Sequence, residues 1–431
     1  MIAALRRAPL LVLLLSPFSG PTLADDVPAA DRPETTLGGH LKARLLGAAL
    51  PADSLFRDSA GAIALDAEGD LRLNLELDQG SWSLRADYQL FFAVGDQARI
   101  FLGLPGDGVF FPRYPNDDLR LMDLTDTLAE GNQGLWRQRL DRLWVGWTGE
   151  RTVLRVGRQS LSWGNGLFYA PMDLVNPFDP AAVDTEYKLG DDMLYGQWLR
   201  GNGDDLQGAV VARRDPVSGD VQGARATVAL KYHGFAGAWE YDLLAAQHYD
   251  DPVAGVGLAR SVGGGIWRAD LVVSDTDDGT FVQALTNFSQ SWVAWNRNMS
   301  GSIELFYNGF GLREGPYDGE RLADNPELLQ RLARGELFSL GRYNLAASVL
   351  VEMTPLWTVS PTVLANLGDD SALFQLITQV SLAEEAVLLG SLNLPLGANG
   401  TEFGGIAAPP PAQGRFLSTE LGVFLQLARY F

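Results

Sequence analysis

The chain has 431 residues, of which 46% are hydrophobic and 10% aromatic, with 48 glycines, no cysteine and a formal net charge of −20. Such an acidic chain is a poor candidate for binding nucleic acid. The absence of cysteine excludes disulfides, thiolate metal sites and a cysteine nucleophile. No stretch beyond the N-terminus holds the ~18 unbroken apolar residues of a membrane helix, so the apolar content must be used in another form.

The N-terminus has the pattern of a secretory signal peptide. Arg6 and Arg7 form a basic start, residues 10–15 are apolar, and Thr22-Leu23-Ala24 gives a small-x-small cleavage site. The apolar run is too short for a membrane anchor. We therefore predict a signal peptide at 1–24 and a mature chain at 25–431, whose net charge becomes −22 when Arg6 and Arg7 are lost from the −20 total.

After a short periplasmic segment at 25–35, period-two alternation begins. Leu71, Leu73, Leu75 and Leu77 alternate with polar residues, and after a turn at Gln79-Gly80 the run 82–92 does the same. This is a hairpin with one apolar and one polar face. In a membrane barrel the apolar face meets lipid and the polar face lines the lumen.

The alternation continues to the end of the chain and predicts an all-β fold. Besides the two runs just described, strands are expected near 36–47, 139–148, 152–162, 193–200, 206–213, 224–232, 235–247, 254–262, 265–274, 281–295, 301–311, 343–353, 357–367, 372–382, 386–394 and 416–431. The total is about 18, and bacterial barrels have an even number. We predict one domain, a transmembrane antiparallel β-barrel.

Connection lengths support this topology. Short turns such as Gly149-Glu150 alternate with long connections at 95–135, 163–191, 312–341 and 396–415. In outer-membrane barrels the short turns are periplasmic and the long loops extracellular. Residues 320–335 are the one predicted helix, with Pro326 at its start. It belongs either to an ordered surface loop or to a loop folded over or into the pore, and plugging by 95–135 or 312–341 stays open.

The last strand closes on an aromatic residue. Leu421, Val423, Leu425 and Leu427 share a face with the terminal Phe431. This arrangement resembles the signal that bacterial outer-membrane barrels present to their assembly machinery. Arg429 departs from the usual apolar residue at its position, and an arginine can extend to the interface there. We expect Phe431 to be the assembly signal.

Aromatic residues cluster at the ends of predicted strands. Their amphipathic rings suit the two membrane interfaces, with core packing as the alternative for any one of them. They are Trp82, Trp144, Trp147, Trp163, Trp198, Trp239, Trp267, Trp292, Trp295, Trp357 and Tyr430.

One segment of about forty residues carries a family resemblance. Val156-Gly157-Arg158-Gln159 is followed by Trp163-Gly164-Asn165-Gly166 and later by Pro171, Asp173 and Asn176-Pro177. This run, within 153–177, resembles a signature of alginate-export-type outer-membrane porins and related uncharacterised barrels. The rest of the chain matches them only in strand pattern. The resemblance implies an 18-stranded conduit with arginines along the channel, with Arg155 and Gln159 facing the lumen and Trp163 to Pro177 entering an extracellular loop.

Arginines concentrate around the same segment, at positions 137, 139, 142, 151, 155 and 158. Alternation directs Arg155 inward and Arg158 outward unless a bulge shifts the register. The residues that we predict to line the pore are Arg142, Arg155, Gln159, Arg85, Asp87, Arg225, Glu240, Asp242, Arg268 and Asp270. Charges of both signs either steer ionic solutes through a transverse field or brace the barrel as cross-strand salt bridges. Both alternatives stay open.

No catalytic, cofactor or metal site is expected. The histidines, His40, His233 and His248, have no motif around them. No nucleophile elbow, phosphate loop or paired-histidine motif is present. The acidic residues between Asp173 and Asp192 fit no calcium loop, and we expect them to be solvated surface charges.

The sequence therefore predicts a non-enzymatic channel of a Gram-negative-type outer membrane that passes small hydrophilic or amphiphilic solutes passively, an export conduit being one form of it. The alternative is a plugged barrel that acts as an envelope scaffold or assembly partner. Expected partners are outer-membrane lipids, the barrel-assembly machinery and, for an exporter, periplasmic proteins, but not nucleic acid. The solute and the direction of transport stay open.

Overall fold

A computed structural model describes residues 33–103, 114–131, 134–408, 412 and 414–431. The predicted signal peptide, its cleavage site and most of the segment 25–35 lie outside these residues. The barrel strands are β1 (Glu34–Ala49), β2 (Ile63–Gln79), β3 (Trp82–Gly95), β5 (Gly134–Thr148), β6 (Thr152–Gln159), β7 (Asp191–Leu199), β8 (Asp205–Val211), β9 (Thr227–Ala236), β10 (Trp239–His248), β11 (Asp251–Val262), β12 (Gly265–Thr276), β13 (Gly279–Ala294), β14 (Arg297–Asn308), β15 (Tyr343–Thr354), β16 (Trp357–Asn366), β17 (Ser371–Ala383), β18 (Ala386–Leu396) and β21 (Leu421–Tyr430). The remaining elements are α1 (Arg57–Ala60), α2 (Asp96–Gly103), β4 (Thr125–Gly131), η3 (Gly223–Arg225), α3 (Gly319–Ala323), α4 (Pro326–Arg334), β19 (Ile406–Ala407) and β20 (Phe416–Leu417).

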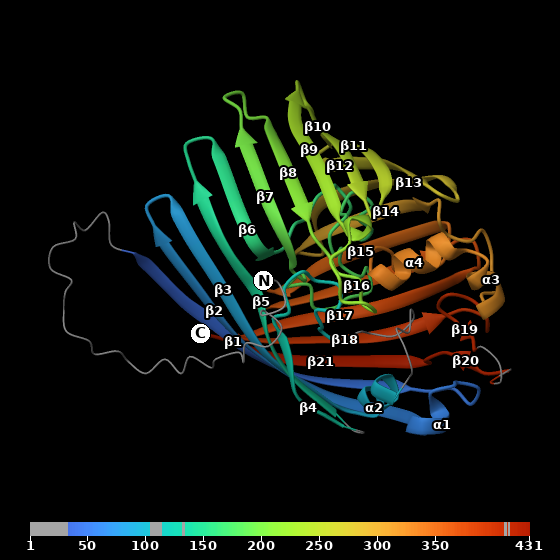
Figure 1. Ribbon diagram of the computed structural model, residues 1–431. Helices are drawn as coiled ribbons and strands as arrows, with labels where there is room; N and C mark the ends of the chain where they lie inside the picture. Colours follow the sequence, from blue (N-terminus) through green and yellow to red (C-terminus); the bar gives the residue numbers. More distant parts are fainter. Residues whose placement is uncertain (1–32, 104–113, 132–133, 409–411, 413) are drawn as a thin grey trace, which may run out of the picture.

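The sheet closes on itself. Each barrel strand pairs antiparallel with its neighbours in the chain, and β21 pairs with both β18 and β1. The described sheet has 19 strands. Of these, β4 pairs only with β5, so 18 strands form the ring. The predicted antiparallel barrel is confirmed. Short turns join the strands at one end, here called the turn end, and the helices α1 to α4 gather at the other, the loop end (Figure 1). At the loop end, short turns also join β10 to β11 and β12 to β13.

The wall is incomplete beside β5. β6 pairs with the part of β5 nearest the turn end, from Leu143 to Thr148. β4 pairs with the same edge of β5 nearer the loop end, from Gly134 to Arg139. The chain therefore leaves the wall after Gln159, and the 31 following residues do not continue the strand. The predicted strand 152–162 is thus shorter than expected.

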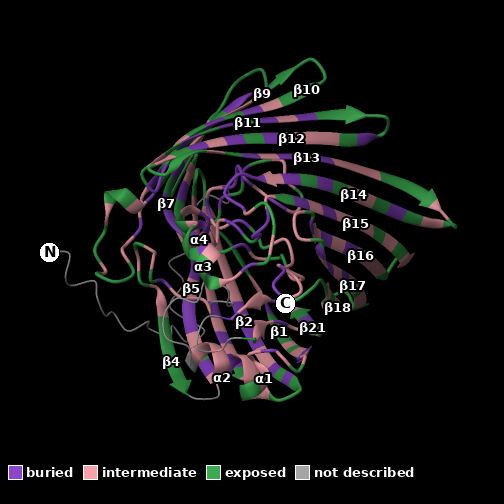
Figure 2. Cartoon of the chain, turned by 90° about the vertical axis from the view of Figure 1, so that its right-hand side faces the viewer, coloured by how far each residue is buried: buried purple, intermediate pink, exposed green. Residues whose placement is uncertain are grey.

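Side chains alternate between the two faces of the wall. On β1, Leu37, Leu41 and Leu45 are exposed on the outside, while His40 and Lys42 are buried on the inside. The same alternation of exposed and buried residues runs along the other strands (Figure 2). An apolar outer face of this kind suits lipid, as predicted. Among the described residues, no helix is both long and apolar enough to cross a bilayer.

The tryptophans are distributed unevenly. Most of them lie at or beside the hairpins of the turn end, where Trp82, Trp198 and Trp357 are exposed on the outside. Two of the tryptophans face the interior instead. Trp163 is 5% exposed and packs inside the barrel against Met172 and Met193. Trp144 pairs with Gly157 on the inner face, with the Arg155 guanidinium 4.9 Å from its ring.

Several boundaries differ from those predicted from the sequence. β2 begins at Ile63, because its first half carries inward-facing acids such as Asp66, which accepts hydrogen bonds from the Gln97 and Ala98 amides. The connection 95–135 contains α2 and β4 as well as loop. The helix predicted at 320–335 is present as α3 and α4, with Pro326 opening α4.

Candidate functional site

Residues 160–190, here called the belt, enter the barrel after β6. The sequence predicted an extracellular loop here, and that was wrong: the segment is bonded to the inner face of the wall. The Trp163 indole nitrogen donates to Gln207 of β8 over 2.7 Å. Asn165 then donates to Asp270 of β12, from its backbone nitrogen over 2.8 Å and from Nδ2 over 2.7 Å. Coil that crosses the interior of the ring is visible in Figure 2.

Glu304 of β14 holds the middle of the belt. Its carboxylate is 0% exposed and accepts from the amides of Leu167 (2.7 Å), Phe168 (3.1 Å) and Tyr169 (2.7 Å). Asn287 of β13 donates to the same carboxylate over 3.0 Å. Three consecutive backbone donors on one buried carboxylate fix both the position and the direction of the belt.

The second half of the belt returns along the remaining wall. Gln375 of β17 donates to the Ala181 carbonyl over 2.9 Å. Lys42 of β1 lies 2.6 Å from Asp184 and 2.7 Å from Glu186. Burial alone would raise the pKa of Asp184, but the hydrogen bond and charge of Lys42 lower it to about 2. The belt is therefore fastened to β1 by charge.

These contacts follow the order of the strands around the ring. The belt touches β8, β12, β14, β17 and β1 in turn, and Arg142 of β5 then donates to the Lys188 carbonyl before β7 begins. The belt also folds back on itself, because Lys188 Nζ contacts Ser162 over 3.0 Å and the Asp173 carboxylate, which brings the start, middle and end of the belt together. It therefore narrows the lumen both along the wall and across the interior.

Several of the arginines inside the barrel are neutralised by carboxylates. Arg72 lies 2.8 Å and Arg142 2.7 Å from the same Asp141 carboxylate. Both Asp141 and Arg142 point inward because a β-bulge leaves Asp141 without a partner on β3, between the pairs formed by Asp87 and Tyr88. Arg85 pairs with Asp87 at 2.9 Å and with Glu76 at 3.1 Å.

Arg158 lies in the seam where β4 replaces β6. It is opposite Leu143 in the register, not on the face shared by Gly146 and Arg155. Its guanidinium is 0% exposed, 2.8 Å from Asp117 and 2.9 Å from Asp192. This arginine closes the wall and does not line a path.

Arg155 and Gln159, which the family resemblance directs to the lumen, have different environments. Arg155 is exposed, and its guanidinium lies 4.9 Å from the centre of the Trp144 ring. Gln159 is 4% exposed and its amide donates to the Met193 carbonyl over 3.4 Å. The first faces open space and the second anchors the start of the belt.

The other predicted pore-lining residues are scattered. Asp242 faces inward and contacts Lys231 at 3.1 Å, and Glu240 lies on the same face and is exposed. Arg268 donates to Ser289 over 3.1 Å, on the same face of β12 as Asp270. Arg225 is a wrong prediction. It belongs to η3 at the loop end, ahead of β9, and pairs with Asp215 of the same connection at 2.6 Å.

The stretch of wall that reaches β21 from the β18 side is uncharged. β16, β17 and β18 contain no Asp, Glu, Lys or Arg. Their inner faces present neutral groups such as Thr362, Gln375 and Ser391. The lumen therefore has a charged side at β1 to β6 and a neutral polar side at β16 to β18.

The acidic residues of 173–192 are mostly not solvated, contrary to the prediction. Asp173 lies in a buried ion pair with Lys188, and Asp191 is 3.1 Å from Arg213. The sequence gives no direct signal for these pairs, because the partners lie on other elements. Among the described residues no group of His, Asp and Glu is arranged to hold a metal ion.

Residues 309–342, which include α3 and α4, form a lid at the loop end. Tyr317, Leu322 and Leu328 of the lid are buried and pack in one cluster with Tyr169 of the belt. Arg331 pairs with Asp251 of β11 at 2.8 Å. Of the two alternatives for this helix, the structure favours a segment folded over the lumen.

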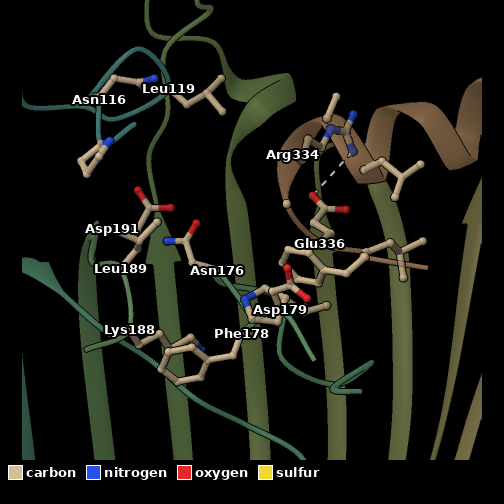
Figure 3. A pocket seen from close by; sticks show the side chains of 18 of the residues that line it. Asn116, Leu119, Asn176, Phe178, Asp179, Lys188, Leu189, Asp191, Arg334 and Glu336 are labelled. Atoms are coloured by element: carbon tan, nitrogen blue, oxygen red, sulfur yellow. Dashed lines mark ion pairs between the residues drawn. The ribbon is translucent and has the colours of Figure 1, made fainter. Parts of the chain in front are cut away.

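A cavity of about 670 Å³, here called the vestibule, lies between belt and lid. Asn176, Asp179 and Lys188 of the belt border it, and Arg334 and Glu336 of the lid face them across the space (Figure 3). Burial would raise the pKa of Glu336, but the charge and hydrogen bond of His248 lower it to about 2. The volume falls in the range of small-molecule sites.

Known proteins resemble this chain in structure alone. No protein-family model matches it, and no curated protein matches it. OccAB4 of Acinetobacter baumannii is 8% identical, with a TM-score of 0.53 over 94% of this chain and 100% of that one. OccAB3 of the same organism is 8% identical, with a TM-score of 0.50 over 92% of this chain and 99% of that one. A BenF-like porin from Pseudomonas fluorescens Pf-5 is 11% identical, with a TM-score of 0.49 over 92% of this chain and 98% of that one. At this identity the likeness shows the fold.

Proposed function

We propose that this protein is a passive channel of the outer membrane for small hydrophilic or amphiphilic solutes. The observation that carries the proposal is a closed ring of strands in which the belt is bonded to the inner wall and leaves the vestibule between itself and the lid. A belt of this kind narrows the lumen, and its polar lining replaces part of a solute's hydration. The predicted signal peptide and Phe431 would deliver the chain to the outer membrane and its assembly machinery.

The resemblance to alginate-export porins would add a polyanionic sugar as the cargo and periplasmic proteins as partners. Arg72, Arg85 and Arg142 are paired with carboxylates, so the wall offers a polyanion few free charges. We therefore favour small solutes over a polyanionic chain.

The plugged scaffold is the rival, because the belt and lid are both fastened by buried contacts. Liposome swelling distinguishes the two. Vesicles that contain the purified barrel should swell in isotonic arabinose or glycine and swell more slowly in larger sugars. Vesicles that behave like protein-free ones with every solute would refute the channel and support the scaffold.

A further inference from the structure

One arginine lies between two tryptophans on the outer face of the wall. Arg260 of β11 is exposed, and its register partners are Trp239 on β10 and Trp267 on β12. All three lie on the outer face, since each tryptophan is three positions from an inward-facing aspartate, Asp242 or Asp270. These three residues are here called the outer-wall site.

The outer-wall site lies close to the turn end. β11 ends at Val262 and β12 begins at Gly265, so Arg260 is two residues from the end of its strand. The exposed tryptophans of the other hairpins lie at the same end of the barrel. Because tryptophan gathers where a bilayer meets water, we expect the outer-wall site to be at the membrane interface.

Toward the loop end, the outer face of the same three strands is uncharged. The next two rows across β10, β11 and β12 are Tyr241, Leu258 and Ala269, and then Leu243, Val256 and Leu271. The residues of the second row are exposed. Successive rows are ~7 Å apart along a strand, so an apolar surface begins directly beside the arginine. Arg260 therefore lies at the boundary of the band that faces lipid.

The guanidinium of Arg260 contacts an aromatic ring and no acid. Its Cζ is 5.0 Å from the centre of the Trp239 ring, which itself meets the Trp267 ring at 5.9 Å and 86°. Contact with the face of a ring uses none of the five N–H donors of an arginine. Within the part of the chain that the structure describes, no carboxylate pairs with Arg260. Its donors are therefore available to an acceptor from the surroundings.

The neighbouring outer surface has no acid that could attract a positive group. The structure describes all residues from Thr227 to Ala294, and on the outer faces of β9 to β13 the one acid is Asp275, near the loop end. Glu240 is close to Trp239 in sequence but lies on the inner face. A headgroup with a net negative charge therefore fits this surface better than one that also carries an ammonium group.

We propose that the outer-wall site binds the phosphate of an anionic phospholipid from the leaflet at the turn end. The Arg260 guanidinium donates to two phosphate oxygens, a geometry for which arginine is suited, and an acyl chain lies along the two apolar rows. This inference rests on the proposed membrane location but not on conduction, because Arg260 lies outside the lumen. Lipid binding and solute permeation can therefore fail separately.

Native mass spectrometry of the full barrel, released from detergent micelles at pH 7, tests the proposal. The probes are phosphatidylglycerol and the zwitterionic phosphatidylethanolamine with the same acyl chains. We expect the first phosphatidylglycerol to bind at least fivefold more tightly. Arg260→Met should remove this preference, and Arg260→Lys should retain part of it, because lysine keeps the charge but loses the planar fork.

Arg429→Met is the matched control. Arg429 also lies on the outer face at the turn end, opposite the exposed Leu41, but it has an acid, Glu385, at 3.9 Å. This variant should bind phosphatidylglycerol within about twofold of wild type. Arabinose should swell liposomes that contain Arg260→Met at the wild-type rate, which would show that the variant is folded.

Three results would overturn the outer-wall site: equal affinity of wild type for the two lipids, unchanged phosphatidylglycerol affinity in Arg260→Met, or an equal loss in Arg429→Met. Displacement of the lipid by millimolar inorganic phosphate would show that phosphate alone is the ligand. Barrel dimers that dissociate in Arg260→Met would assign the surface to a second copy of the chain. Either of these results would also refute a lipid as the ligand.

Discussion

Glu304→Gln should release the middle of the belt while the barrel stays folded. Glutamine removes the charge that three consecutive amides share and brings its own donor toward them. The glutamine oxygen still accepts from the two amides that share one carboxylate oxygen, but its NH2 group faces the Leu167 amide and Asn287 Nδ2, which share the other. A buried donor left without an acceptor costs roughly 1–3 kcal/mol, so two donors give a local loss of about 2–6 kcal/mol, reduced by any water that enters. The wall does not depend on this side chain, because β14 keeps its backbone pairing with β13 and β15.

Hydrogen–deuterium exchange measures this release directly. A local loss of about 3 kcal/mol corresponds to roughly 150-fold faster exchange, expected at the amides of Leu167, Phe168 and Tyr169. Glu240→Gln is the matched control, since Glu240 is an exposed glutamate on the inner face. Single-channel current of Glu304→Gln should be noisier and larger than that of wild type. Wild-type exchange at the three amides would refute the view that Glu304 holds the belt.

Further predictions concern topology, assembly and pH. Glu320 lies in α3 at the loop end and Glu150 in the turn between β5 and β6. In the cysteine-free chain, Glu320→Cys should react with an impermeant maleimide on intact cells and Glu150→Cys should not. Equal labelling of the two variants would refute the prediction that the loop end faces outside. The side chain of Phe431 is 59% exposed, and its backbone amide and carbonyl both bond to Gly39. Deletion of Phe431 should therefore lower the outer-membrane yield more than it lowers the melting temperature of the refolded barrel. A normal yield would show that Phe431 is not an assembly signal. Burial raises the pKa of Glu402 from its ordinary value of 4.5 to about 7, so wild type should lose thermal stability relative to Glu402→Gln as the pH rises from about 5 to 7; melting temperatures that change in parallel would refute this.

The wall could be predicted from the sequence because it follows a local rule. Alternation of apolar and polar residues at period two assigns each side chain of a strand to a face, and Leu41 and Lys42 illustrate the result. The rule fails where the backbone departs from regular pairing. The bulge at Asp141 directs two successive residues inward, and Arg225 lies in a connection that the alternation extended into a strand.

The belt could not be predicted because its partners are remote. Asn165 and Asp270 are 105 residues apart, and Lys42 and Asp184 are 142 apart. Neither member of such a pair carries a local signature that names the other. The arginines near 139–158 were a real signal of an unusual region, but alternation assigns a face and cannot show that Asp141 or Asp192 neutralises the charge.

Planar-bilayer recording of the wild-type barrel tests the central claim most directly. A belt that narrows the lumen without sealing it should leave a steady ohmic conductance at low voltage, with discrete insertion steps and no requirement for a partner protein. Repeated insertion of folded, heat-modifiable protein without any conductance step would contradict the channel and establish that belt and lid together seal the lumen.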